Sequence, residues 1–188
     1  MAVFLALGGD WTVGLWRSAG TPQTTELVAR LADYDTWNKS QGWSFEVAAG
    51  KIYFWAPASP DMAGPLRPWV SDGTAAGTRQ LADMDRADPP YIPAGGRTFV
   101  AAGVKVFFAA DDGLHGNELW GTDGIPGSTA LAADLWPGPL SSDPRQLTGL
   151  GDELALVAQT PLAGAELRLF APCTGNLQIV ADLAPGPS

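Results

Sequence analysis

The sequence contains one cysteine, Cys173, and one histidine, His115, among its 188 residues. A single cysteine excludes an internal disulfide and a cysteine-based metal site. A single histidine excludes a histidine-rich metal centre, and no Ser/His/Asp arrangement can be placed around it. Basic residues are scarce as well, since 11 Lys and Arg stand against 20 Asp and Glu and form no run. The net charge of −9 argues against nucleic acid and against an anionic membrane surface as partners.

Long apolar segments are also missing. No run approaches the ~20 residues that a membrane-spanning helix needs, so we expect no membrane insertion. The apolar start of the chain, residues 1–7, lacks the basic region and the full apolar region of a signal peptide, and its match to residues 52–55 predicts a strand. Gly and Pro are abundant, at 23 and 16 residues, and the apolar content is 46%. This composition favours one folded, turn-rich domain over residues 1–188.

A repeated segment of about 50 residues organises the chain. Each copy has a Trp or its substitute followed fourteen residues later by an acid or its substitute, namely Trp16 and Arg30, Trp69 and Asp83, Trp120 and Asp134, and Arg168 and Asp182. Between the two lies a turn rich in Gly, Thr and Asp, with Asp72 in the second copy and Asp123 in the third. Such turns suit strands joined in hairpins, because Gly supplies positive φ and Asp bonds its own backbone.

Short apolar runs of 4–6 residues, bounded by Gly, Pro, Asp or Ser, precede and follow each turn. This pattern is typical of β-strands, and no run has the length or period of a surface helix. Four short strands per copy predict the blades of an all-β protein, a β-propeller. We expect a propeller of four blades or a four-blade portion of a larger one, with copies at about 1–44, 45–97, 98–144 and 145–188.

The first copy is one strand short. Copies two to four have a first run at residues 45–48, 98–101 and 145–148, whereas the first copy starts directly with the second run, Val3–Ala6. We therefore expect fifteen strands and an open edge at Val3–Ala6. Two explanations stay open: the chain is a piece of a longer protein, or another chain, which could be a second copy, supplies the strand by main-chain pairing.

The segment Glu118-Leu119-Trp120-Gly121-Thr122-Asp123-Gly124, with Gly77-Thr78 in the copy before it, resembles the bacterial ELWxxDGTxxGT repeat. That repeat is a propeller-forming, hyalin-like unit of large secreted and surface proteins. The resemblance implies an extracellular or cell-surface location and a role in adhesion or recognition, without implying a ligand or a catalytic residue. Ala19 replaces the turn Asp in the first copy, and Arg168 replaces Trp in the last.

The repeated residues are interpreted here as parts of blade construction: Trp16, Trp69, Trp120, Asp72, Asp123, Asp83, Asp134 and Asp182. For the last three, we expect carboxylates that accept backbone N–H groups, because an unpaired buried carboxylate is costly. Two of them could instead serve as the acid and nucleophile of a glycosidase, which requires a separation of about 5–9 Å. An enzyme therefore remains an alternative, although a non-catalytic protein is favoured.

The loop around His115 offers one cation hypothesis. Asp111, Asp112 and Glu118 carry the oxygen ligands that calcium prefers. Their spacing differs from that of an EF-hand loop, and the matching positions of the last copy are Gln159 and Thr160. We expect no cofactor, with calcium as the alternative, and we expect His115 to be an exposed loop residue.

Aromatic residues in polar linkers are the best candidates for binding. Residues 34–43 carry Tyr34, Trp37 and Trp43, and the equivalent linker at 84–96 carries Tyr91. Flat rings beside Asn, Gln and Asp suit sugar rings and protein hot spots, although they also suit a loop folded over the edge of a blade. The leading hypothesis is a non-catalytic module that presents interblade loops to a protein or carbohydrate ligand. The alternative is a structural subunit completed by a strand from another chain.

Overall fold

A computed structural model describes residues 2–33, 45–58, 66–86, 99–125, 127–161 and 163–181. In these ranges the strands form four antiparallel sheets, and the one helical element is the short 3-10 segment η1 (Pro22–Thr24). The all-β prediction is therefore confirmed. No helix in the described ranges is long and apolar enough to cross a membrane.

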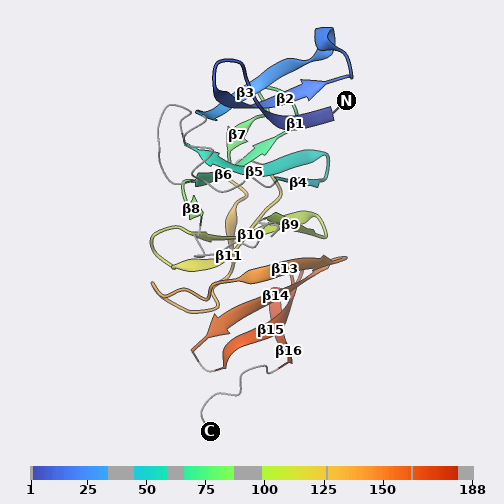
Figure 1. Cartoon of the computed structure of the whole chain (residues 1–188). Helices are drawn as coiled ribbons and strands as arrows, with labels where there is room; N and C mark the ends of the chain where they lie inside the picture. Colours follow the sequence, from blue (N-terminus) through green and yellow to red (C-terminus); the bar gives the residue numbers. More distant parts are fainter. Residues whose placement is uncertain are drawn as a thin grey trace.

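Each sheet is built from strands that follow one another in sequence (Figure 1). Sheet A comprises β1 (Ala2–Leu7), β2 (Thr12–Ser18) and β3 (Glu26–Asp33). Sheet B comprises β4 (Phe45–Ala48), β5 (Lys51–Pro57), β6 (Leu66–Ser71) and β7 (Arg79–Gln80). Sheet C comprises β8 (Asp85–Arg86), β9 (Phe99–Ala102), β10 (Lys105–Asp111), β11 (Asn117–Thr122) and β12 (Ala130–Ala133). Sheet D comprises β13 (Arg145–Leu150), β14 (Glu153–Thr160), β15 (Gly164–Ala171) and β16 (Asn176–Ala181).

The described strands number sixteen rather than the expected fifteen, and the additional one is β8. β8 lies in a segment expected to be a linker and pairs with β10 through Asp85 and Asp111. The Asp85 carboxylate also forms an ion pair with Arg67 of β6. The ion pair joins sheet B to sheet C beside the pairing of β8 with β10, and local sequence does not reveal it.

The register of the sheets shows that the anchor positions are structurally equivalent. Trp16, Trp69, Trp120 and Arg168 stand opposite Phe4, Phe54, Phe108 and Leu156, respectively. Each anchor therefore occupies the same position in the pairing register of its sheet. The equivalence allows residues of different sheets to be compared directly.

Three apolar clusters join the sheets in chain order. The first contains Leu15 of sheet A and Phe54 of sheet B, the second joins Trp55 of sheet B to Phe108 of sheet C, and the third joins Phe107 of sheet C to Leu156 of sheet D. Each inner sheet thus packs on both faces. Because such strands are apolar on both sides, the segments at 52–56 and 106–110 read as continuous apolar runs.

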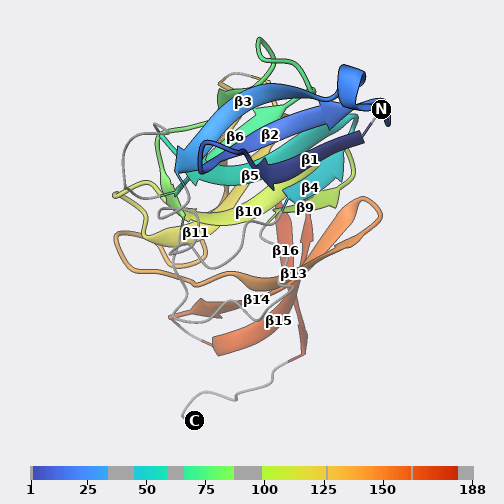
Figure 2. The same cartoon turned by 45° about the horizontal axis from the view of Figure 1, so that its top comes forward.

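The stack of sheets is open. Sheets A and D lie at opposite ends, with β1 at one end and β16 at the other (Figure 1). The same order from sheet A to sheet D is visible after a 45° turn (Figure 2). One face of sheet A and one face of sheet D consequently have no neighbouring sheet among the described residues.

Candidate functional site

The repeated turns are fastened by hydroxyl groups. Ser71 Oγ accepts the Gly73 N–H at 3.0 Å and lies 2.7 Å from Thr78 Oγ1. Thr122 Oγ1 accepts the Gly124 N–H at 3.0 Å and the Thr129 hydroxyl at 3.1 Å. The same pattern occurs in sheet A, where Ser18 Oγ accepts the Gly20 N–H and forms a hydrogen bond with Thr25 Oγ1.

The turn aspartates bond their own backbone. Asp72 Oδ1 accepts the Thr74 N–H at 2.9 Å and its hydroxyl at 2.7 Å, and Asp123 Oδ1 accepts the Ile125 N–H at 2.8 Å. The Thr74 hydroxyl holds the pKa of Asp72 below its ordinary value, and the Ser128 hydroxyl has the corresponding effect on Asp123. These two aspartates therefore stabilise turns.

The turns of sheets B and C also contact the preceding sheet. Lys51 of β5 donates to the carbonyl oxygens of Asp123 and Gly124 at 3.1 Å each, and Arg17 of β2 donates to the Gly73 carbonyl at 3.2 Å. Gly124 has a φ of +74°, and a Cβ there would lie 2.5 Å from Tyr53 Oη. Glycine is thus required at this contact for conformation and for space.

Two anchor tryptophans make equivalent hydrogen bonds. Trp69 Nε1 donates to the Ala56 carbonyl at 3.2 Å and Trp120 Nε1 donates to the Ala110 carbonyl at 3.0 Å. Arg168, in the anchor place of sheet D, donates to the Thr160 hydroxyl at 3.0 Å instead. In the described ranges the buried Trp16 Nε1 has no partner.

The repeat acids differ from expectation. Asp83 and Asp134 are exposed, and Asp83 forms an ion pair with Arg67 at 3.3 Å rather than serving as a buried acceptor. The buried carboxylate is Glu118, two residues before the anchor Trp120. Glu166 of sheet D occupies the same position and is also buried. The sequence signal for this role was the Glu shared by these two copies.

Glu118 holds the segment that joins sheets C and D. Its Oε2 accepts the Leu135 N–H at 2.9 Å and the Ser142 hydroxyl at 2.6 Å, and its Oε1 accepts the Ser142 N–H at 2.9 Å. Burial raises the pKa of Glu118, and these hydrogen bonds oppose the shift. Since its oxygens face residues 135 and 142, Glu118 does not join Asp111 and Asp112 in a cation site.

His115 is half-buried rather than fully exposed. Its Nδ1 lies 2.8 Å from Asp112 Oδ2, and Asp112 Oδ1 accepts the backbone N–H groups of Leu114 and His115. The bond to Asp112 raises the pKa of His115. Burial alone would raise the pKa of Asp112, but the bonds from His115 and Leu114 outweigh it, so that this pKa is lowered. The contact between His115 and Asp112 therefore closes this loop.

Metal binding finds no support in the described ranges, where no group of three or more His, Cys, Asp or Glu side chains could hold an ion. Cys173 is exposed in the turn between β15 and β16. The four aromatic candidates, Tyr34, Trp37, Trp43 and Tyr91, lie outside the described residues, as does Asp182.

The edge of sheet A is the most distinctive surface of the chain. Among the described strands, β1 pairs with β2 alone, whereas the equivalent strands β5, β10 and β14 each also pair with a preceding strand. Those preceding strands are β4, β9 and β13, and neighbouring ones contact each other across the sheets. A strand beside β1 would extend this row by one.

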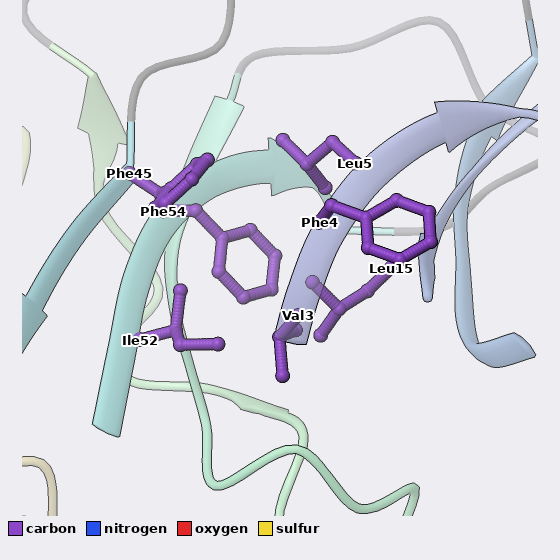
Figure 3. Close-up of a pocket in the computed structure, with 7 residues that line it drawn as sticks. All are labelled: Val3, Phe4, Leu5, Leu15, Phe45, Ile52 and Phe54. Carbon is purple, nitrogen blue, oxygen red and sulfur yellow. The ribbon is translucent and has the colours of Figure 1, made fainter. Parts of the chain in front are cut away.

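A shallow apolar hollow lies between β1 and β2 of sheet A and β4 and β5 of sheet B (Figure 3). Its walls come from β1 and β2 on one side and from β4 and β5 on the other: Val3, Phe4, Leu5, Leu15, Phe45, Ile52 and Phe54. In Figure 3 the rings of Phe45 and Phe54 lie on the β5 side, and the ring of Phe4 points away from Phe54. Sequence reasoning found the edge at Val3–Ala6 but not the opposing wall.

Phe45 shows what the vacant position costs. Phe45 is 47% exposed, whereas the equivalent Phe99 of sheet C is 1% exposed. Phe99 packs against Trp55 and Phe108, each with ring centroids 5.1 Å away. Val47, on the same face of β4, is 61% exposed. Phe45 and Val47 thus form an exposed apolar surface on β4.

No protein-family model matches the chain, and no curated protein matches its sequence. Among solved structures, a puromycin hydrolase is similar with a TM-score of 0.62 and 18% identity, over 99% of this chain and 27% of that chain. A puromycin-hydrolysing peptidase from Mycobacterium tuberculosis is similar with a TM-score of 0.53 and 15% identity, over 95% of this chain and 26% of that one. TolB from Acinetobacter baumannii has a TM-score of 0.50 and 16% identity, over 96% and 40%.

These similarities concern the fold alone, because the identities are low. The matching parts of the neighbours are β-propeller domains, so the four sheets form a β-propeller-like fold. The chain spans only about a quarter to two fifths of the length of these proteins.

Proposed function

We propose that the chain is a non-catalytic, protein-binding portion of a larger β-propeller-like structure, and that it accepts an extended polypeptide segment along β1. The observation that carries the proposal is the contrast between Phe45, 47% exposed beside the β1 edge, and Phe99, 1% exposed at the same place in sheet C. A strand paired with β1 would satisfy main-chain groups and cover Phe45 at once. This combines recognition of a protein with completion of sheet A by another chain.

The expected ligand has a definable pattern. In sheet C, Phe99 and Ala101 face sheet B while Val100 and Ala102 face sheet D. A segment in the same role beside β1 would direct residues equivalent to Val100 and Ala102 toward Phe45 and Val47. We therefore expect an extended segment with small or medium apolar residues at alternate positions, without proline in its centre.

Location and further ligands rest on the sequence. The resemblance to surface-protein repeats supports an extracellular or cell-surface setting, and the aromatic residues Tyr34, Trp37, Trp43 and Tyr91 support a protein or glycan contact. The uncovered faces of sheets A and D argue against a closed propeller of four blades.

Peptide binding tests the proposal. The probe is a fluorescein-labelled peptide with the sequence of residues 97–104, which includes β9. We expect saturable binding by fluorescence anisotropy, and we expect at least tenfold weaker binding after Phe45→Lys, because a charge would face the apolar side of the ligand. The control Val104→Lys changes a hairpin residue that is 86% exposed and should bind as the parent does.

Backbone pairing is tested with the same peptide carrying N-methyl groups on alternate residues. Methylation removes the N–H donors of one strand edge, so binding should be lost for one of the two alternating patterns and retained for the other. Equal binding of both methylated peptides, or equal affinity of the parent and Phe45→Lys chains, would refute strand addition at β1.

A further inference from the structure

The three interfaces between sheets are made in one way. Each sheet offers one face to the sheet that follows: Leu15 in sheet A, Tyr53, Trp55 and Val70 in sheet B, and Phe107 and Leu119 in sheet C. The following sheet covers it with the opposite face, which carries Phe54 in sheet B, Phe108 and Trp120 in sheet C, and Leu156 and Phe170 in sheet D. We call the face that a sheet turns to the following sheet its giving face, and the opposite face its covering face. Equivalent residues form each face in every sheet.

Sheet D has a giving face without a cover. Register places Ala155 and Leu169 where sheet B has Tyr53 and Val70, and it places Val157 and Leu167 where sheet B has Trp55 and Pro68. Tyr53, Trp55 and Val70 are buried by sheet C, whereas the four residues of sheet D are half-buried. No further sheet adjoins them within the described part of the chain.

Sheet A has a covering face without a neighbour. Phe4, Trp16 and Leu27 stand in one row across β1, β2 and β3, equivalent to Phe108, Trp120 and Leu131 of sheet C. Leu27 is 46% exposed, and Trp16 is half-buried. Gly14 makes room for the row, since a Cβ there would overlap Leu27. Phe4 points away from sheet B (Figure 3).

We propose that a second copy of this chain seats the covering face of its sheet A on the giving face of sheet D. The contact continues, between two copies, the interface that the chain already makes three times within itself. It is heterologous, because it joins two different surfaces, and it leads to a closed ring or to a longer assembly depending on the rotation between copies. This proposal is independent of the ligand at the β1 edge.

Charge gives the association a characteristic salt dependence. Each copy carries a formal charge of −9, so two copies repel one another at long range. The proposed interface itself is apolar, so added salt screens the repulsion without weakening the contact. Association should therefore strengthen from low to moderate ionic strength, unlike that of an interface held by ion pairs.

Complementary variants test the arrangement by sedimentation velocity over a wide range of concentration. Leu27→Lys disrupts the covering face of sheet A, and Leu167→Lys disrupts the giving face of sheet D. Leu114→Lys, at an exposed loop residue off both faces, is the matched control. Circular dichroism and thermal unfolding establish that each variant keeps its fold.

The parent chain and Leu114→Lys should form dimers or larger species, and each face variant alone should be monomeric. An equimolar mixture of the two face variants should form a dimer of twice the monomer mass, because one intact pair of faces remains between unlike copies. A parent chain that stays monomeric at its highest soluble concentration would overturn the proposal. So would a face variant mixture that stays monomeric, or a Leu27→Lys chain that associates as the parent does.

Discussion

Glu118 of β11 and Ser142 of the following linker are joined by two hydrogen bonds, one to the Ser142 hydroxyl at 2.6 Å and one to its backbone N–H at 2.9 Å. Ser142 in turn offers its carbonyl oxygen to the N–H of Gln159 in β14 at 2.7 Å. The pair therefore connects sheet C to sheet D through the linker. It explains why a Glu precedes the anchor Trp in this copy of the repeat.

Replacing Glu118 by Gln should lower the free energy of unfolding by about 1–3 kcal/mol, because the amide nitrogen of Gln would face an N–H or O–H group that now donates a hydrogen bond to the carboxylate. Urea denaturation measures the loss. Glu153→Gln changes an exposed Glu on β14 and should leave stability within about 0.5 kcal/mol. Equal stability of the two variants would show that Glu118 is not the fastening point of the linker.

The anchor tryptophans allow a comparison within one chain. Trp120→Phe leaves the Ala110 carbonyl without its indole donor, so we expect a cost that includes about 1 kcal/mol for the lost hydrogen bond. Trp16→Phe removes an indole N–H that has no partner in the described structure and should cost less. Thermal unfolding of both variants decides the matter, and a larger loss for Trp16→Phe would contradict the assigned role.

His115 should titrate above its ordinary pKa of 6.5, because Asp112 stabilises the charged ring. Nuclear magnetic resonance of the ring protons measures this pKa directly, and Asp112→Asn should lower it toward 6.5. A pKa that is raised on folding stabilises the fold below the unfolded value, and this contribution is lost as pH rises through the folded value. The stability gap between the parent and Asp112→Asn should therefore be larger near pH ~5 than near pH ~9. A His115 pKa at or below 6.5 in the parent would contradict the pairing of His115 with Asp112.

Much of the fold could be predicted because its signals are local. The Gly, Asp and Thr residues of the turns, such as Ser71–Thr78, mark hairpins directly, and the repeat shows how many strands sheets A, B and D have. The vacancy beside β1 also followed from comparing copies. What could not be predicted depends on contacts between sheets: β8 accompanies the pairing of Asp85 with Arg67, and Glu118 is buried only because the linker returns over it.

The candidate site shows the same division. The edge at Val3–Ala6 was found by counting strands. The exposure of Phe45, however, depends on the absence of a strand beside β1, which the sequence of β4 does not indicate. Asp83 and Asp134 look like buried acceptors from their regular spacing, yet both are exposed. Regular spacing thus identified equivalent positions without showing that Asp83 and Asp134 lie beyond the last residues of β7 and β12.

Amide hydrogen exchange in β1 and in the equivalent strands β5, β10 and β14 tests the central claim, that β1 is an acceptor for an incoming strand. In the free chain, amides of β1 that point away from β2 should exchange much faster than the corresponding amides of β5, β10 and β14, which are paired on both sides. Adding the peptide of residues 97–104 should slow exchange in β1 and leave the other three strands unchanged. Exchange in β1 that is already as slow as in β10, or that the peptide does not alter, would contradict the account.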